Sequence, residues 1–259
     1  MKRDDLIHPV VSGNKWRKLK GFFKEIDRTK TIITFGGAYS NHLPATALAA
    51  KMHSMSIVGV VRGEELNVQS NDRLTYCRNQ NMKLHFIPRS EYRSLRLNEW
   101  NMDLDALGLS TLETIILPEG GAGKSVLVGC QEIWKEIREE CTPDHLVISS
   151  GTGATSLGIL SAMEEGSQTT VHVISAVRGA VREMHRVCNY AQKRNIKLNW
   201  VDESFGGYGK SAPELFAAME FFKEKTGISL DRNYNAKLWY WLEKNPLEGQ
   251  IVWVNTGGF

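Results

Sequence analysis

The stretch Leu146-Val147-Ile148-Ser149-Ser150-Gly151-Thr152-Gly153-Ala154-Thr155 joins a short apolar run to a glycine-containing loop. An apolar run of this length predicts a buried strand, and the apolar spacing over residues 156–165 predicts a helix directly after the loop. Strand, glycine loop and helix in this order are typical of the carboxyl edge of a parallel sheet. The stretch therefore indicates an α/β fold.

The same alternation runs along the chain. Further strands are predicted at residues 31–35, 56–61, 84–87, 171–174 and 251–254, and further helices at residues 43–53, 125–139, 180–194, 213–225 and 236–242. Strands that alternate with helices build parallel sheets with helical crossovers. The polar stretch 90–110 has little apolar periodicity and is predicted to be irregular.

The composition is typical of a globular protein that binds small molecules. The chain has 259 residues, of which 42% are hydrophobic and 24% charged, and its formal net charge is +3. This charge is too small and too evenly spread to favour nucleic acid or a membrane surface as partner. No apolar run approaches the ~20 residues of a membrane-spanning helix.

Four cysteines (Cys77, Cys130, Cys141 and Cys188) lie far apart, with no Cys-x-x-Cys pair. Without such a pair and with no secretory leader apparent, a reduced cytoplasm is the expected compartment. No metal site is expected. The sequence also contains no internal repeat and no linker, so a division into domains must run through short connections.

Three glycine loops follow predicted strands, at residues 36–41, 120–125 and 149–155. Such loops bring backbone N–H groups together at a helix N-terminus, where an anion is favoured. The third is the best phosphate cradle because Thr152 and Thr155 add hydroxyl donors. The second contains Gly-Lys-Ser, but Pro118 stands where a nucleotide P-loop needs glycine. The alternative that each loop only connects a strand to a helix, without binding a ligand, stays open.

A lysine-rich segment, Ser12-Gly13-Asn14-Lys15-Trp16-Arg17-Lys18-Leu19, lies near the N-terminus. Neighbouring cations lower the pKa of a lysine and make its amine a nucleophile toward an aldehyde. On charge alone, however, a solvated basic helix face is the better interpretation of Lys15.

Six segments in order resemble the 1-aminocyclopropane-1-carboxylate deaminase and D-cysteine desulfhydrase family, which are fold-type II, tryptophan synthase beta-like pyridoxal-phosphate enzymes. The first segment runs from Lys2 to Leu19 and contains Lys2-Arg3-Asp4-Asp5-Leu6 and Ser12-Gly13-Asn14-Lys15-Trp16-Arg17-Lys18-Leu19. The others are Phe35-Gly36-Gly37-Ala38-Tyr39-Ser40-Asn41-His42, the 149–155 loop, Gly207-Tyr208-Gly209, the 230–237 stretch and Asn255-Thr256-Gly257-Gly258. The resemblance covers nearly the whole chain.

The resemblance implies a role for each matching residue. Lys15 would carry pyridoxal 5'-phosphate (PLP) as a Schiff base and act as the base at the substrate Cα. Asn41 would bind the 3-hydroxyl and Thr256 would face the pyridine nitrogen. The phosphate would be bound by Gly151, Thr152, Gly153, Ala154 and Thr155.

The substrate side of the site would be formed by Ser40, Asn41, His42, Tyr208 and Tyr234. Ser40 and the two tyrosines are the further catalytic candidates, whereas His42 fits a structural role better. Each tyrosine could instead pack in the core with its hydroxyl bonded to the backbone.

Two positions separate this chain from a deaminase-like sequence. Asn235 follows Tyr234 where such a sequence carries glutamate, and Asn255 replaces the histidine that usually precedes Thr256. Both the missing glutamate and Thr256 favour D-cysteine desulfhydrase-like α,β-elimination, which yields a 2-oxo acid, ammonia and sulfide. The deaminase, which yields 2-oxobutyrate and ammonia, is the first alternative.

The resemblance implies two open twisted α/β/α domains with the cofactor in the cleft between them. The smaller is predicted at residues 19–117 and the larger at 1–18 with 118–259. A homodimer is expected. Family members usually extend beyond both ends of this sequence, which leaves a non-catalytic PLP-binding protein as an alternative of another class.

Overall fold

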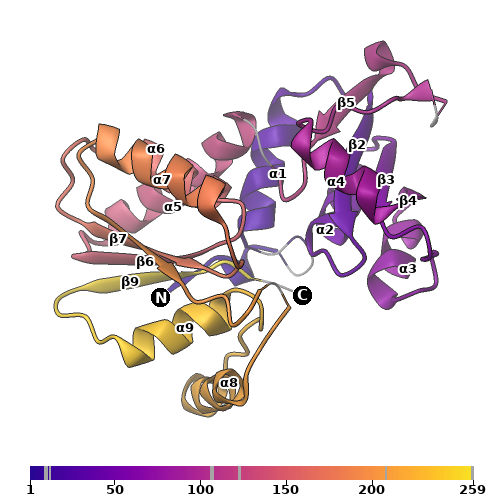
Figure 1. Ribbon diagram of the computed structural model, residues 1–259. Coiled ribbons are helices and arrows are strands. Elements are labelled where there is room, and N and C mark those ends of the chain that lie inside the picture. The colour runs from indigo at the N-terminus through magenta and orange to yellow at the C-terminus, as the bar shows by residue number, and fades with distance from the viewer. Residues whose placement is uncertain (9–10, 12, 106–107, 122–123, 208, 258–259) are drawn as a thin grey trace. The chain divides into compact units, whose positions relative to one another are not determined.

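The computed structural model describes residues 1–8, 11, 13–105, 108–121, 124–207 and 209–257. Two compact units emerge, one formed by Met1–Arg17 with Leu127–Phe259 and the other by Lys18–Val126. Each contains a parallel sheet with helices packed on it, which confirms the predicted α/β class (Figure 1). The predicted domain limits, 19–117 and 1–18 with 118–259, stay a prediction.

The sheet of the larger unit has the strand order β1-β9-β6-β7-β8. Its strands are β1 (Lys2–Arg3), β6 (His145–Ser150), β7 (Thr170–Ser175), β8 (Leu198–Asp202) and β9 (Ile251–Asn255). Each pairing is parallel, so the carboxyl ends of these strands share one edge. That edge carries the loop after Ser150, Thr256 after β9 and the chain that leaves β1.

Alternate residues of the central strands face two different helix layers. Leu146 and Ile148 pack against α5 (Lys124–Glu140), α6 (Ala154–Ala162) and α7 (Val181–Lys193). Val147 and Ile174 pack against α8 (Pro213–Thr226) and α9 (Asn235–Lys244), on the other side of the sheet in Figure 1. Burial on both faces explains why these strands have nearly continuous apolar sequences.

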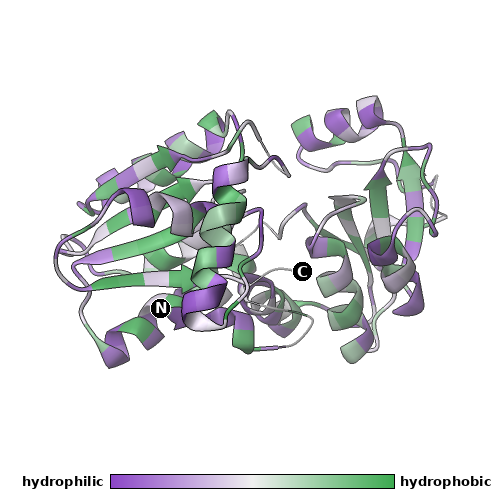
Figure 2. Ribbon diagram, turned by 90° about the horizontal axis from the view of Figure 1, so that it is seen from below, coloured by the Kyte–Doolittle hydropathy of each residue, from purple (hydrophilic) through white to green (hydrophobic). Residues whose placement is uncertain are grey.

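The smaller unit contains the strand order β4-β3-β2-β5. Its strands are β2 (Thr31–Gly37), β3 (Ile57–Arg62), β4 (Lys83–Ile87) and β5 (Thr114–Leu117), and its helices include α2 (His42–Met52), α3 (Asp72–Asn79) and α4 (Arg89–Leu97). Helix α1 (Asn14–Glu25) begins in the larger unit and ends in this one, and single 3-10 turns lie at Asp4–Leu6 and Thr111–Glu113. In Figure 2 the strands of both sheets are mostly green, the colour of hydrophobic residues.

The prediction of an irregular segment at residues 90–110 is wrong for its first part. Helix α4 covers Arg89–Leu97, and it buries Tyr92 and Leu95 against Phe35 and Trp100. Two apolar residues three positions apart suffice to anchor a short helix, but they are too few to give a clear period in sequence. Strands β1, β5 and β8 were likewise not predicted; the first has two residues and β8 is only half-buried. Within the described ranges, no helix is long and apolar enough to span a membrane.

Helix α6 packs so closely on α5 that only glycine fits at position 158. A Cβ on Gly158 would lie 2.3 Å from Cys130 Cβ and 2.9 Å from the Leu127 carbonyl oxygen. We expect Gly158→Ala to destabilise the protein by about 1–3 kcal/mol through overpacking, although alanine normally favours a helix. Thermal unfolding of this variant, beside Ala162→Gly as a propensity control, checks it. A Gly158→Ala variant more stable than the wild type would contradict the packing.

Candidate active site

The loop after β6 has the features of an anion cradle. Gly153 adopts a left-handed φ of 74° as the N-cap of α6, and Thr155 lies buried in the first helical turn. The hydroxyls of Ser149, Ser150 and Ser156 are buried and have no hydrogen-bond partner among the residues that the structure describes. A buried hydroxyl without a partner is costly, and an oxygen-rich anion such as a phosphate at the helix N-terminus would satisfy that of Ser156, which lies in the first turn of α6. These residues therefore fit a phosphate group.

Lys15 is tied to this loop through its neighbour Asn14. The Asn14 side-chain nitrogen donates to Thr155 Oγ1 over 3.2 Å, and Asn14 Oδ1 accepts from Lys15 Nζ over 3.2 Å. The Thr155 hydroxyl thus accepts from Asn14 and keeps its own proton to donate. An amine and a phosphate cradle are brought together within one unit.

The strand-end residue Thr256 meets the same segment. Its carbonyl oxygen accepts from the Asn14 backbone N–H over 3.1 Å. A Cβ on Gly13 would lie 1.7 Å from that oxygen, and Gly13 has a φ of 59°, so both space and backbone conformation require glycine there. The Gly-Asn-Lys element therefore lies directly against the end of β9.

Asn235 binds Thr256 from the other side. Its Oδ1 accepts from the Thr256 backbone N–H over 3.1 Å and from Thr256 Oγ1 over 3.4 Å. Its amide nitrogen donates to Asp231, whose carboxylate also accepts the backbone N–H groups of Asn233, Tyr234 and Asn235. Asn235 is thus held in one orientation and fixes the position of Thr256.

Tyr234 lies beside the phosphate loop. A Cβ on Gly151 would lie 2.9 Å from the Tyr234 phenolic oxygen, so the absence of a side chain at position 151 makes room for the phenol. The other predicted tyrosine, Tyr208, lies outside the described residues. The structure therefore brings together Lys15, Thr155, Tyr234 and Thr256 with the loop glycines.

The predicted residues Ser40, Asn41 and His42 lie in the smaller unit. Ser40 Oγ accepts from the His42 backbone N–H over 3.0 Å, and Asn41 Oδ1 accepts from Arg73. The His42 ring is buried, and its Nε2 lies 2.8 Å from Thr34 Oγ1. Because Thr34 donates its own proton to the Leu117 carbonyl, His42 Nε2 is the donor to it. This arrangement supports a structural role for His42.

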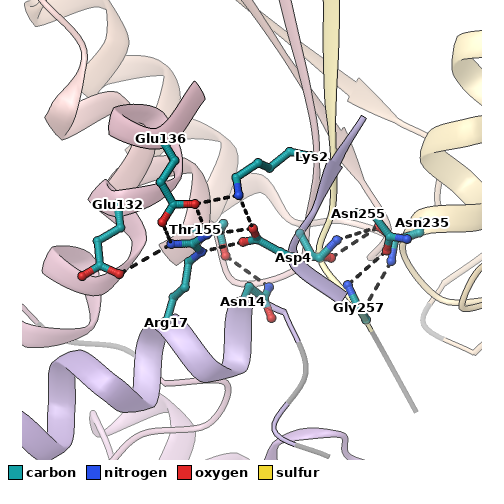
Figure 3. A network of polar contacts seen from close by, with 11 residues as sticks. Lys2, Asp4, Asn14, Arg17, Glu132, Glu136, Thr155, Asn235, Asn255 and Gly257 are labelled. Atoms are coloured by element: carbon teal, nitrogen blue, oxygen red, sulfur yellow. Dashed lines mark hydrogen bonds and ion pairs between the residues drawn. The ribbon is translucent and has the colours of Figure 1, made fainter. Parts of the chain in front are cut away.

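A buried guanidinium anchors the start of helix α1 (Figure 3). Arg17 donates to both Asp4 carboxylate oxygens, over 2.6 and 2.8 Å, and to both Glu136 carboxylate oxygens, each over 2.7 Å. Arg17 is 2% exposed and Asp4 is fully buried. Lys2 completes the network through a 2.6 Å ion pair with Glu136.

Sequence reasoning missed this network. The matching charges lie 13 and 119 residues from Arg17, so no local pattern reveals them. The quoted resemblance did include Asp4 and Arg17 within its segments, but without a function for either. Their effect is positional, because Arg17 lies two residues after Lys15 in the same helix.

Solved structures with the same fold are known. No family model matches the chain. A crystal structure of a 1-aminocyclopropane-1-carboxylate deaminase homologue superposes with a TM-score of 0.80 at 26% identity, covering 100% of this chain and 83% of that one. Serine racemase from Dictyostelium discoideum shares the fold alone, with a TM-score of 0.70 and 13% identity. The two parallel sheets are those of fold-type II PLP enzymes.

Sequence relatives define the family. The bifunctional D-cysteine desulfhydrase/1-aminocyclopropane-1-carboxylate deaminase of Arabidopsis thaliana is 29% identical over 290 residues, covering 100% of this chain and 71% of that protein. D-cysteine desulfhydrase of Klebsiella pneumoniae strain 342 is 26% identical, with 100% and 86% covered. A Pyrococcus furiosus protein provisionally named as the deaminase is 28% identical, with 100% and 84% covered. Over its full length the chain is thus homologous to the deaminase and D-cysteine desulfhydrase family of fold-type II PLP enzymes.

The Arg17 network predicts a pH-dependent contribution to stability. Hydrogen bonds from Arg17, helped by Lys2, lower the pKa of Glu136 to about 2 from 4.5. A depressed carboxylate pKa adds stability that is complete above the unfolded value and lost as the pH falls through the folded one.

We therefore expect Glu136→Gln to unfold roughly 2–4 °C below the wild type at pH 7, since solvent screens this partly exposed carboxylate and limits its effect to about 1 kcal/mol. The difference should shrink as the pH falls from about 4.5 toward 2. Glu132→Gln, whose carboxylate lies 3.5 Å from Arg17, is the matched control with a smaller effect. Melting curves across this range check it, and a difference that stays constant with pH would contradict it.

Proposed function

We propose that this protein is a PLP-dependent lyase that acts on D-cysteine by α,β-elimination. D-Cysteine and water would give pyruvate, ammonia and hydrogen sulfide. The observation that carries the proposal is the hydrogen-bonded path from Lys15 through Asn14 to Thr155, which joins an amine to an anion cradle. This pairing is what a phosphorylated aldehyde cofactor needs.

The residues of the larger unit fit that cofactor. Gly151, Thr152, Gly153, Ala154 and Thr155 would hold its phosphate, followed in helix α6 by the unpartnered hydroxyl of Ser156. Thr256 would meet the ring nitrogen, and Asn41 of the smaller unit would bind the 3-hydroxyl. When bound, PLP supplies an electron sink that stabilises negative charge at the substrate α-carbon.

Side chains of this protein would carry out the proton transfers of the reaction. The Lys15 amine removes the proton from the substrate α-carbon, and Asn14 holds that amine in place. Ser40, Tyr208 and Tyr234 are the proposed hydroxyl groups on the substrate side, where a proton must reach the leaving sulfur. His42, whose ring is bonded to Thr34 and whose backbone N–H is bonded to Ser40 Oγ, would keep the Ser40 loop folded.

The pair Asn235 and Thr256 supports elimination from D-cysteine over opening of a cyclopropane ring. Asn235 is neutral where a deaminase-like sequence has glutamate, and its Oδ1 accepts from Thr256. A neutral hydroxyl at the ring nitrogen would leave the cofactor ring less electron-withdrawing than an acidic partner would. This environment suits expulsion of a good leaving group such as a thiol.

We also propose a homodimer in the cytoplasm. The dimer follows from the family resemblance, and the four free cysteines suit a reducing compartment. Sedimentation of the purified protein at about twice the monomer mass would support the dimer; the monomer mass at all concentrations would refute it.

Product analysis tests the proposed reaction. With PLP supplied, we expect sulfide and pyruvate from D-cysteine, little 2-oxobutyrate from 1-aminocyclopropane-1-carboxylate, and a loss of at least about 10²-fold in Lys15→Ala. Lys24→Ala, an exposed lysine of the same helix, is the matched control and should keep full activity. More 2-oxobutyrate than sulfide would identify a deaminase instead. Bound PLP without turnover of either substrate would support the alternative of a non-catalytic PLP-binding protein.

The Thr256 hydroxyl gives a second prediction. Thr256→Val keeps the shape of the side chain but removes the hydroxyl, so we expect kcat on D-cysteine to fall roughly tenfold, as loss of one neutral hydrogen bond of about 1.4 kcal/mol implies. Thr256→Ser restores the hydroxyl and should recover most of the rate. Equal kcat values for Thr256→Val and the wild type would remove Thr256 from the proposed site.

A further inference from the structure

Helix α9 buries a lysine that the proposed chemistry does not use. Lys237 is fully buried although it lies on a helix whose other lysine, Lys244, is exposed. Burying an ammonium group without partners is strongly unfavourable. Its surroundings must therefore replace the water that it loses.

Three backbone carbonyls do so. Lys237 Nζ donates to Ala176 over 3.1 Å, to Ser204 over 2.7 Å and to Gly207 over 3.1 Å. An ammonium has three N–H donors, and all three are used. Burial lowers the pKa of this lysine. The three carbonyls nevertheless need three N–H donors, and only the protonated Lys237 amine supplies three.

The three acceptors come from two segments at the carboxyl edge of the larger sheet. Ala176 directly follows β7, and the 204–207 loop follows β8. Gly206 and Gly207 have φ values of 87° and 136°. Glycine adopts many backbone conformations with similar energy, so contacts from outside the loop must select this one. Lys237 links this loop to helix α9 through hydrogen bonds, beside the packing of Phe205 on Tyr240 of that helix.

We propose that the Lys237 ammonium is a positioning group, a built-in cation that folds the 204–207 loop onto the sheet edge and so directs the chain leading into Tyr208. Converging backbone carbonyls are also the ligands of potassium in proteins. Removing the lysine side chain should therefore leave a cage that a monovalent cation can enter. The effect of this clamp on turnover rests on the proposed function; the clamp itself does not.

Hydrogen exchange tests the clamp without any substrate. In tetramethylammonium buffer, we expect Lys237→Ala to raise amide exchange over residues 203–207 by about tenfold or more and to lower the melting temperature. Added potassium chloride should reverse part of both changes. Lys237→Met fills the same space without charge or donors, so it should loosen the loop and show no potassium response. Lys223→Ala, an exposed lysine of α8, should match the wild type.

Two results would overturn the proposal: wild-type exchange in Lys237→Met, or the same potassium response in both Lys237 variants. If neither variant folds, amine acetylation of the native wild type decides, because Lys237 must react far more slowly than Lys223. Equal labelling of the two lysines would refute the clamp. A loosened loop in Lys237→Ala together with wild-type protein inactive on D-cysteine would sustain the clamp and reject the proposed function.

Discussion

The arrangement of the larger unit depends on one buried guanidinium. Arg17 donates four hydrogen bonds to Asp4 and Glu136, and so fixes the N-terminal segment, helix α1 and helix α5 to one another. A buried ion pair is stabilising only when its geometry satisfies both partners, and this one is bidentate on both sides. Because Lys15 lies two residues before Arg17, the same network fixes the backbone from which the lysine amine extends.

Buried polar groups define the carboxyl edge in the same way. Asn14 joins Lys15 to Thr155, Asn235 joins Thr256 to Asp231, and Lys237 gathers three carbonyls. Each of these side chains would be costly to bury unpaired, so each arrangement holds only while its partners stay in place. The apolar layers on both faces of the sheet supply the stability that allows this concentration of polar groups at one edge.

The sequence predicted the α/β class and the central strands because their apolar runs are buried on both sides. It missed β1, β5, β8 and the helices α1, α3 and α4. The strands, α3 and α4 are short or partly buried, which leaves no clear apolar period. Motif resemblance selected Lys15, the 149–155 loop, Tyr234 and Thr256 together, and the structure gathers them in one unit. The roles of Arg17 and Lys237 could not be predicted, since their partners lie between 13 and 119 residues away and include backbone atoms.

Lys15 is the residue proposed to hold the cofactor beside the anion cradle. The most direct measurement is peptide mass mapping after the protein has been incubated with PLP and reduced with borohydride. We expect one reduced cofactor on the peptide that contains Lys15, with a visible absorbance band before reduction that is absent in Lys15→Ala. A cofactor fixed on another lysine, or no fixed cofactor and no band, would contradict it.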